Sequence, residues 1–92
     1  MKTLYISYCT EYEAGWGQRP DGFAMTEDKE TMEEFIKTKG NTGGRDYFWR
    51  YDEPTMVRCD DEQYDVIKAK MSEGIAHFHN SDKSKMELFK QI

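Results

Sequence analysis

The sequence predicts an α+β fold, in which residues 1–92 form a single domain with a mostly antiparallel sheet of three to five strands and two to three helices. Short runs in which apolar and polar residues alternate indicate the strands, and capping residues followed by apolar residues at helical spacing indicate the helices. The strand candidates lack the long apolar runs of a buried parallel sheet, which favours antiparallel pairing. A chain of 92 residues without an internal repeat or a linker accommodates one modest core.

The first strand is expected near the N-terminus. Leu4, Ile6 and Tyr8 occupy alternate positions, which is the period of a strand with one apolar face. Residues 10–22 contain three glycines and a proline, so they are expected to form a stiff, shaped loop rather than a strand or a helix. Residues 23–25 then predict a short second strand that leads back from this loop.

A first helix is expected directly after the second strand. Thr26 or Asp28 can act as its N-cap, and the acidic residues that follow suit the positive end of the helix dipole. Apolar residues at the spacing i, i+3 and i+4 form its buried side: Met32, Phe35 and Ile36. Gly40 is expected to end the helix, and residues 41–44 to form a flexible connection.

The most aromatic run of the chain, residues 47–51, is a strong strand candidate. Residues 52–54 are expected to form a turn, and residues 55–59 to return as the second strand of a hairpin. Pro54 must then lie outside the hydrogen-bonded ladder or on an edge, because proline has no N–H group to donate.

A second helix is predicted to begin at residue 60. Asp60 and Gln63 have the spacing of a capping box, and Cys59 and Tyr64 have that of the accompanying hydrophobic staple. Three residues are expected to form the buried stripe of this helix: Tyr64, Ile67 and Met71. Gly74 stands where a glycine commonly ends a helix.

The C-terminal part is predicted to contain an edge strand and a last helix. Residues 75–79 alternate in polarity, which indicates the strand. Ser81 or Asp82 can cap the helix. Its apolar residues are Met86, Leu88, Phe89 and Ile92.

Composition and charge limit the possible classes of function. Hydrophobic residues make up only 37% of the chain but aromatic residues make up 14%, so the core is expected to form around aromatic rings. The net charge of −5 opposes direct binding to duplex nucleic acid, which requires clustered Lys and Arg. No segment approaches the roughly 18 apolar residues of a membrane span, and no signal-peptide run follows Met1. A soluble, intracellular protein with Cys9 and Cys59 as free thiols is therefore expected.

Residues 15–22 are the strongest candidate for a binding loop. Trp16 offers a flat apolar face, and Arg19 offers a planar fork of hydrogen-bond donors. The loop also supplies an acidic residue and three shape-giving glycines: Asp21, Gly15, Gly17 and Gly22. A structural alternative is that Trp16 covers the core while Arg19 pairs with Asp21 or a nearby glutamate. The spacing of a phosphate loop or a dinucleotide-binding motif is absent.

The aromatic run supplies a second candidate contact surface. Alternation places Tyr47, Trp49 and Tyr51 on one face of the predicted strand, and Phe48 and Arg50 on the other. Trp49 and Arg50 belong to residue types that dominate binding energies at protein interfaces, so they are candidate contact residues. Simple core and sheet packing explains the same pattern. Three arginines in or near this region could form a local positive patch: Arg45, Arg50 and Arg58.

Catalytic and metal-binding motifs are weak. His77 and His79 lie on the same side of the predicted strand, but zinc requires three or four ligands. Neither histidine has a spacing to a cysteine that indicates a nucleophile and its base. No cofactor and no metal are therefore expected. The acidic clusters at residues 27–34 and 60–65 are explained as solvated helix starts, and mimicry of a nucleic acid is not favoured by the mild acidic excess.

Residues 15–23, followed shortly by a capped helix, resemble small uncharacterised accessory proteins of tailed bacteriophages. The layout of residues 51–54, Val57 and the helix that ends before residues 74–75 is similar as well. Together these segments cover about two thirds of the chain, but only the tryptophan loop is specific. The resemblance implies a viral origin, a location in the host cytoplasm and action by stoichiometric binding to a host component.

The sequence thus favours a non-enzymatic, phage-type protein that inhibits a host defence protein by binding it, in an anti-CRISPR-like manner. An alternative is a sponge, possibly homo-oligomeric, that sequesters a nucleotide second messenger. A second alternative is a small phage housekeeping enzyme that uses its histidines. The expected partner is a protein, with a nucleotide-like ligand possible and neither duplex nucleic acid nor a membrane expected.

Overall fold

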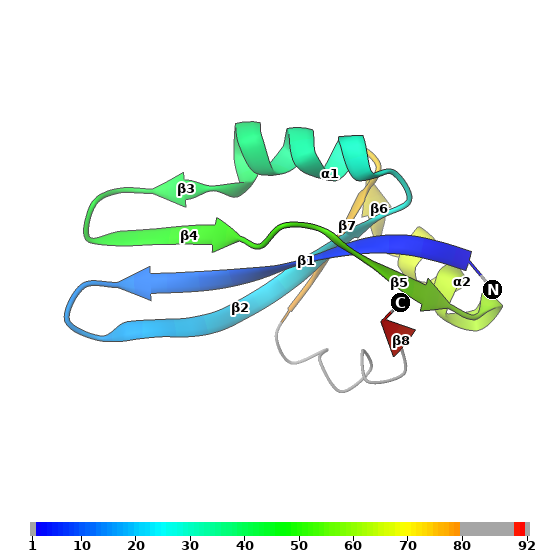
Figure 1. The fold of residues 1–92 in the computed structure, drawn as a ribbon, viewed down its shortest axis with the longest axis horizontal. Coiled ribbons are helices and arrows are strands. Elements are labelled where there is room, and N and C mark those ends of the chain that lie inside the picture. Colours follow the sequence, from blue (N-terminus) through cyan, green and yellow to red (C-terminus); the bar gives the residue numbers. More distant parts are fainter. Residues whose placement is uncertain (1, 80–89, 92) are drawn as a thin grey trace.

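The computed structural model describes residues 2–79 and 90–91. Within these residues the fold is one antiparallel sheet of eight strands with two helical segments (Figure 1). The longer strands are β1 (Lys2–Glu13), β2 (Gly17–Thr26), β4 (Tyr47–Tyr51), β5 (Thr55–Cys59) and β7 (Ile75–Phe78). Three strands have only two residues each: β3 (Thr42–Gly43), β6 (Met71–Ser72) and β8 (Lys90–Gln91). The predicted α+β class is confirmed, and the short strands raise the strand number above the expected three to five.

Strand β1 is the centre of the sheet, whose order is β3-β4-β1-β2-β7-β6. One side of β1 pairs with β2, and the other side pairs with β5 over residues 2–6 and with β4 over residues 9–13. The predicted hairpin of residues 47–51 with residues 55–59 is therefore wrong, because β4 and β5 follow each other along β1. The Asp52 N–H donates to the Tyr8 carbonyl at 2.9 Å, which keeps the chain beside β1 instead of reversing it. Pro54 lies outside the ladder, as predicted.

The predicted loop of residues 10–22 is wrong for most of its length. Strand β1 continues to Glu13, β2 begins at Gly17, and only residues 14–16 form the turn. Gly15 and Gly17 have positive φ angles of 86° and 88°, so they shape a tight hairpin turn rather than an open loop. The pairing shifts register between Tyr8 and Thr10, opposite residues 20–23 of β2, and this irregularity accommodates Pro20 inside the strand.

The two helical segments cover opposite faces of the sheet. Alternate residues of β2 belong to different core clusters, since Phe23 and Met25 pack on one face and Ala24 on the other. Helix α2 (Asp61–Lys70) packs on the first face through Ile67, with a cluster that includes Leu4, Ile6, Phe23, Met25, Val57, Cys59 and Ala76. Helix α1 (Lys29–Phe35) packs on the second face through Met32, with Ala24, Ile75, Phe35, Ile36 and Tyr51. Cys9 and Cys59 are buried, and their thiols are free, as predicted.

The helix starts are where the capping residues predict them. The Asp28 carboxylate accepts from the Thr31 N–H at 3.3 Å, and Asp60 and Gln63 form the complete capping box. Helix α1 continues as the π-helix η1 (Ile36–Gly40), which ends at the predicted glycine. The predicted end of the second helix at Gly74 is wrong, because the chain leaves the helix after Lys70 to pair β6 with β7. Glu73 and Gly74 have positive φ angles of 55° and 84° and form the turn between these strands.

The C-terminal predictions have different outcomes. Strand β7 is present, although it lies between β2 and β6 rather than at an edge. Most of the predicted last helix, residues 81–89 and 92, lies outside the described residues. Lys90 and Gln91 form β8, which pairs with β5, so the helix does not include them. In the part of the chain that the structure describes, no helix combines the length and the apolar character needed to cross a bilayer.

The molecule is elongated, with principal extents of 42 × 26 × 23 Å. The hairpins β1–β2 and β3–β4 lie side by side and extend past α1 at one end (Figure 1). We call this extension, residues 9–21 and 42–50, the arm.

Candidate functional site

Trp16 stands at the tip of the arm with 83% of its surface exposed. It occupies the β1–β2 turn, where its N–H donates to the Glu13 carbonyl at 3.0 Å. The neighbouring Ala14 N–H donates to the Asp46 carbonyl at 2.8 Å, which ties the two hairpins of the arm together. Trp16 therefore does not cover the core, and the indole projects from a turn that backbone hydrogen bonds hold in place.

Arg19 is bound within the arm, where it pairs with a nearby glutamate. Its Nη2 and Nε atoms lie 2.8 and 3.1 Å from the same Oε1 atom of Glu11, and Nη2 lies 3.2 Å from Glu13 Oε2. The register places Arg19 directly opposite Glu11 across the β1–β2 pair. The guanidinium thus already has two carboxylate partners, and its role is to join two strands.

Tyr47 joins the third strand to this network. Its hydroxyl donates to Glu11 Oε1 at 2.6 Å, and its ring meets the Trp49 ring edge-on at 4.6 Å. The Glu11 side chain is nearly buried, so these donors replace the water that it would otherwise bind. The Tyr47 hydrogen bond and then the Arg19 guanidinium hold the pKa of Glu11 below its ordinary value, while Glu11 raises the pKa of Tyr47. The network joins β2, β1 and β4 into one unit.

The lowered pKa of Glu11 predicts an acid-sensitive arm. Above the ordinary value of 4.5 the carboxylate is charged in both folded and unfolded chains, so its network stabilises the fold fully. The contribution is lost as the pH falls through the lower folded pKa. Glu11→Gln should therefore melt below wild type at about pH 7, and the difference in melting temperature should shrink as the pH is lowered below 4.5, as thermal unfolding monitored by circular dichroism can show. A difference that stays the same across this range would contradict the assignment.

The aromatic strand β4 directs its residues to opposite faces of the arm. Phe48 stacks on Tyr12 at 4.9 Å, and the Arg50 guanidinium lies 4.6 Å from the centre of the Phe48 ring. Trp49 lies on the other face, half-buried beside Tyr47. The structure thus places Trp49 and Arg50 on opposite faces of the arm.

The remaining predicted loop residues have distinct places. Asp21 is exposed on β2, and Gly15 and Gly17 shape the turn beside Trp16. Gly22 is buried where β7 pairs with β2, and a Cβ atom there would lie 2.4 Å from the Phe78 carbonyl oxygen. Gly22 therefore belongs to the sheet rather than to a contact surface. His77 and His79 are exposed, and the described residues contain no group of three or more potential metal ligands.

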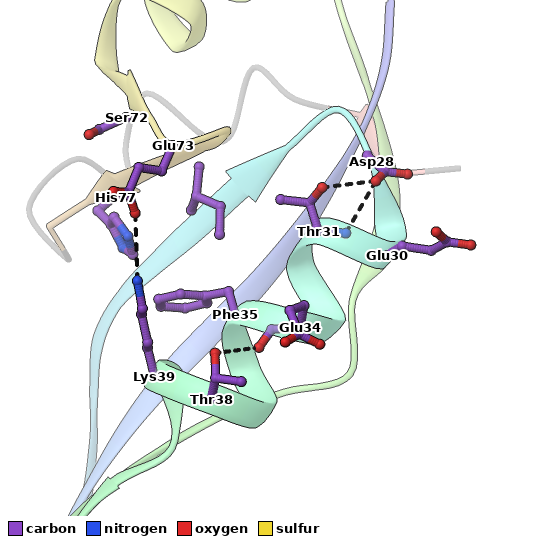
Figure 2. Close-up of a pocket in the computed structure, with 11 residues that line it drawn as sticks. Asp28, Glu30, Thr31, Glu34, Phe35, Thr38, Lys39, Ser72, Glu73 and His77 are labelled. Atoms are coloured by element: carbon purple, nitrogen blue, oxygen red, sulfur yellow. Dashed lines mark hydrogen bonds and ion pairs between the residues drawn. The ribbon is translucent and has the colours of Figure 1, made fainter.

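A groove of about 640 Å³ lies between the α1–η1 segment and the β6–β7 hairpin (Figure 2). Phe35, Ile75 and His77 provide its less polar lining, and the neighbouring side chains partly desolvate the His77 ring, which lowers its pKa. Four carboxylates and one ammonium group are among its lining residues: Asp28, Glu30, Glu34, Glu73 and Lys39. The sequence explains Asp28, Glu30 and Glu34 as part of a solvated helix start, and no local pattern shows that Glu73 lies beside that helix.

Among the residues that the structure describes, the tip of the arm and the groove beside α1 are candidate surfaces for function. Comparisons of the chain with protein-family models, with curated proteins and with solved structures find no match.

Proposed function

We propose that this chain is a non-enzymatic binding protein that grips a protein partner with Trp16 at the tip of the arm. The observation that carries the proposal is the 83% exposure of a tryptophan on a tight turn. Burying an aromatic side chain removes about 150–250 Å² from water, and tryptophan is enriched among the residues that dominate interface energies. The exposure of Trp16 in the free protein is explained if a partner covers the indole on binding.

The rigidity of the arm supports this role. Glu11, Arg19 and Tyr47 link three strands below the tip, and the Ala14–Asp46 hydrogen bond links the two turns. A partner that binds the tip orders little additional chain, so less of the binding energy is lost as entropy. The network thus supports recognition by holding Trp16 in place rather than by contacting the partner.

A protein partner is favoured over a nucleotide by the charge around the tip. A phosphate group requires donors that are free to meet it, whereas the Arg19 guanidinium already faces Glu11 and Glu13. An anion there would have to displace carboxylates or lie beside them. Within this proposal, the target is a bacterial defence protein in the host cytoplasm, which the chain inhibits stoichiometrically as a phage accessory protein. The resemblance of residues 15–23 to phage proteins supports that finer assignment.

Trp16→Ala is expected to weaken partner binding by at least about 30-fold without lowering the melting temperature, because hot-spot residues contribute about 2 kcal/mol or more. Val66→Ala is the matched control, since Val66 is a 53% exposed apolar residue on α2. Affinity capture from bacterial lysates, followed by titration calorimetry with the captured protein, measures both variants. Equal retention of every partner by wild type and Trp16→Ala would refute the role of the tip.

The target class has its own test. Wild-type chain expressed in defended bacteria should restore plaque formation by a restricted phage in proportion to its dose, and Trp16→Ala should not. A panel of nucleotide second messengers should leave the melting temperature unchanged. A rise with any of them would instead favour the sponge, because a ligand of the folded state stabilises it by mass action.

A further inference from the structure

We propose that the groove between α1–η1 and the β6–β7 hairpin is a docking site for a basic segment of a partner protein, with an arginine side chain as its main contact. This site is separate from Trp16 and goes beyond the function proposed for the arm. Figure 2 shows its two sides, the helix that carries Glu30 and Glu34 and the hairpin turn that carries Glu73.

The lining of the groove is a rigid, partly apolar surface. The Phe35 ring meets the rings of Tyr51 at 5.2 Å and His77 at 5.1 Å, both edge-on, so it is fixed beside the groove. Ile75 is only 6% exposed. The Thr26 hydroxyl donates to the Gly74 carbonyl at 2.8 Å and holds the hairpin turn in place. The aliphatic stem of an arginine can pack on such a surface while its charged end stays at the rim.

The charge of the groove selects a cation. Four lining carboxylates and the single Lys39 ammonium give a net charge of −4 + 1 = −3. His77 adds little positive charge near neutral pH, since partial desolvation lowers its pKa below the ordinary 6.5. Asp28 is occupied as the N-cap of α1, where it accepts from the Thr31 N–H and hydroxyl. An anionic segment would meet three uncompensated negative charges, whereas a basic segment is attracted.

We expect Glu30 and Glu34 to receive the arginine at the outer rim of the groove, since Figure 2 shows the Glu30 side chain directed away from His77 and Glu73. Glu30 and Glu34 are one helical turn apart, and like charges at this spacing destabilise a helix. Among the described residues neither forms an ion pair, whereas Lys29 of the same helix pairs with Glu33 at 3.7 Å. A guanidinium beside them relieves the repulsion, because its planar N–H groups can donate hydrogen bonds to both carboxylates.

Lys39 occupies a cation position in which the arginine of a partner can replace its ammonium group. Its Nζ lies 3.6 Å from Glu73 Oε2 and connects η1 to the hairpin turn (Figure 2). Both side chains are largely exposed, so the ion pair is weak and can exchange for another cation. The groove volume of about 640 Å³ is adequate for a few side chains of a bound segment.

The test uses the full chain and a short fluorescent peptide that alternates arginine with leucine, measured by fluorescence anisotropy. The expected result is saturable binding that weakens at least about tenfold in Glu30→Gln/Glu34→Gln. The double variant Glu62→Gln/Asp65→Asn removes the same charge from exposed positions of α2 and should bind like wild type. Lys39→Gln should bind more tightly, because the competing cation is gone.

Three results would overturn the proposal: no binding of the arginine peptide, equal binding of a peptide with glutamate in place of arginine, or equal losses in the α1 and α2 double variants. Equal losses in the two double variants would show that the net charge of the protein, and not the groove, determines peptide binding. Trp16→Ala should bind the peptide like wild type. If the arginine peptide binds the groove but Trp16→Ala does not weaken partner binding, only the function proposed for the arm fails. If Trp16→Ala weakens partner binding but the peptide does not bind, only the groove proposal fails.

Discussion

Gly22→Ala is expected to destabilise the fold by about 2–6 kcal/mol, a large part of the stability of a domain of this size. Two separate effects contribute. The φ angle of Gly22 is 112°, which residues with a Cβ atom rarely adopt, and such strain costs about 1–3 kcal/mol. The added Cβ atom would also lie 2.4 Å from the Phe78 carbonyl oxygen, and overpacking of this kind costs about 1–3 kcal/mol more.

The clash in Gly22→Ala is expected to push β2 and β7 apart. Phe23, the next residue, pairs with Phe78 and stacks on its ring at 4.8 Å, so moving the Phe78 carbonyl disturbs this pair as well. Gly15→Ala is the matched control. Gly15 also has a positive φ of 86°, but its Cβ atom would meet nothing within 4 Å, so only the backbone strain of about 1–2 kcal/mol is expected. Urea unfolding of both variants measures the difference, and equal losses would show that the contact with β7 does not matter.

Met32→Ala is expected to destabilise the fold by about 2–5 kcal/mol. Met32 is fully buried between α1 and the sheet, in a cluster with Ala24 and Ile75. It is the only buried residue of the seven-residue helix α1, so removing its side chain leaves a cavity at the main anchor of that helix. Helices this short depend on tertiary packing for their stability. Loss of the anchor should therefore loosen α1 more than the rest of the chain.

Urea unfolding and hydrogen exchange together test the role of Met32. Val66→Ala removes an exposed apolar side chain from α2 and should change stability by no more than about 0.5 kcal/mol. In Met32→Ala the amides of α1 should lose protection before those of β1. The arginine peptide should also bind less tightly, because α1 forms one side of the groove. Unchanged protection of α1 would show that its position is set by contacts other than Met32.

Local chemistry explains which predictions the structure confirms. The side chain of Asp28 and the reciprocal pair of Asp60 and Gln63 satisfy backbone groups within three residues, so these helix starts depend on nothing distant. The alternation of Leu4, Ile6 and Tyr8 identifies the face of β1 that packs in the cluster under α2, and residues 47–51 form the predicted strand. Gly40 ends its helix where a Cβ atom would crowd the Phe35 and Tyr51 rings.

Pairing explains the predictions that are wrong. Three glycines and a proline indicate a loop, yet residues 17–22 form a strand because β1 lies beside them and supplies hydrogen-bonding partners. Residues 52–54 indicate a reversal, but their backbone is held along β1 and the two flanking strands share that neighbour. Gly74 has the positive φ expected at a helix end, and the same property serves the β6–β7 turn.

The candidate surfaces also combine features that local sequence shows with features that depend on contacts between distant segments. The residue types that suit recognition at the tip, Trp16 above all, are visible in the sequence, but the pairing of Arg19 with Glu11 depends on a strand register that local patterns do not specify. The groove joins Glu34 to Glu73 across segments far apart in the chain. The sequence by itself determined the helix starts, the strand faces and the chemical character of each residue, because these follow from neighbours within one turn or one pleat. Only the tertiary structure decided which strands pair, which arginine is neutralised and where carboxylates gather, because those depend on contacts between distant segments.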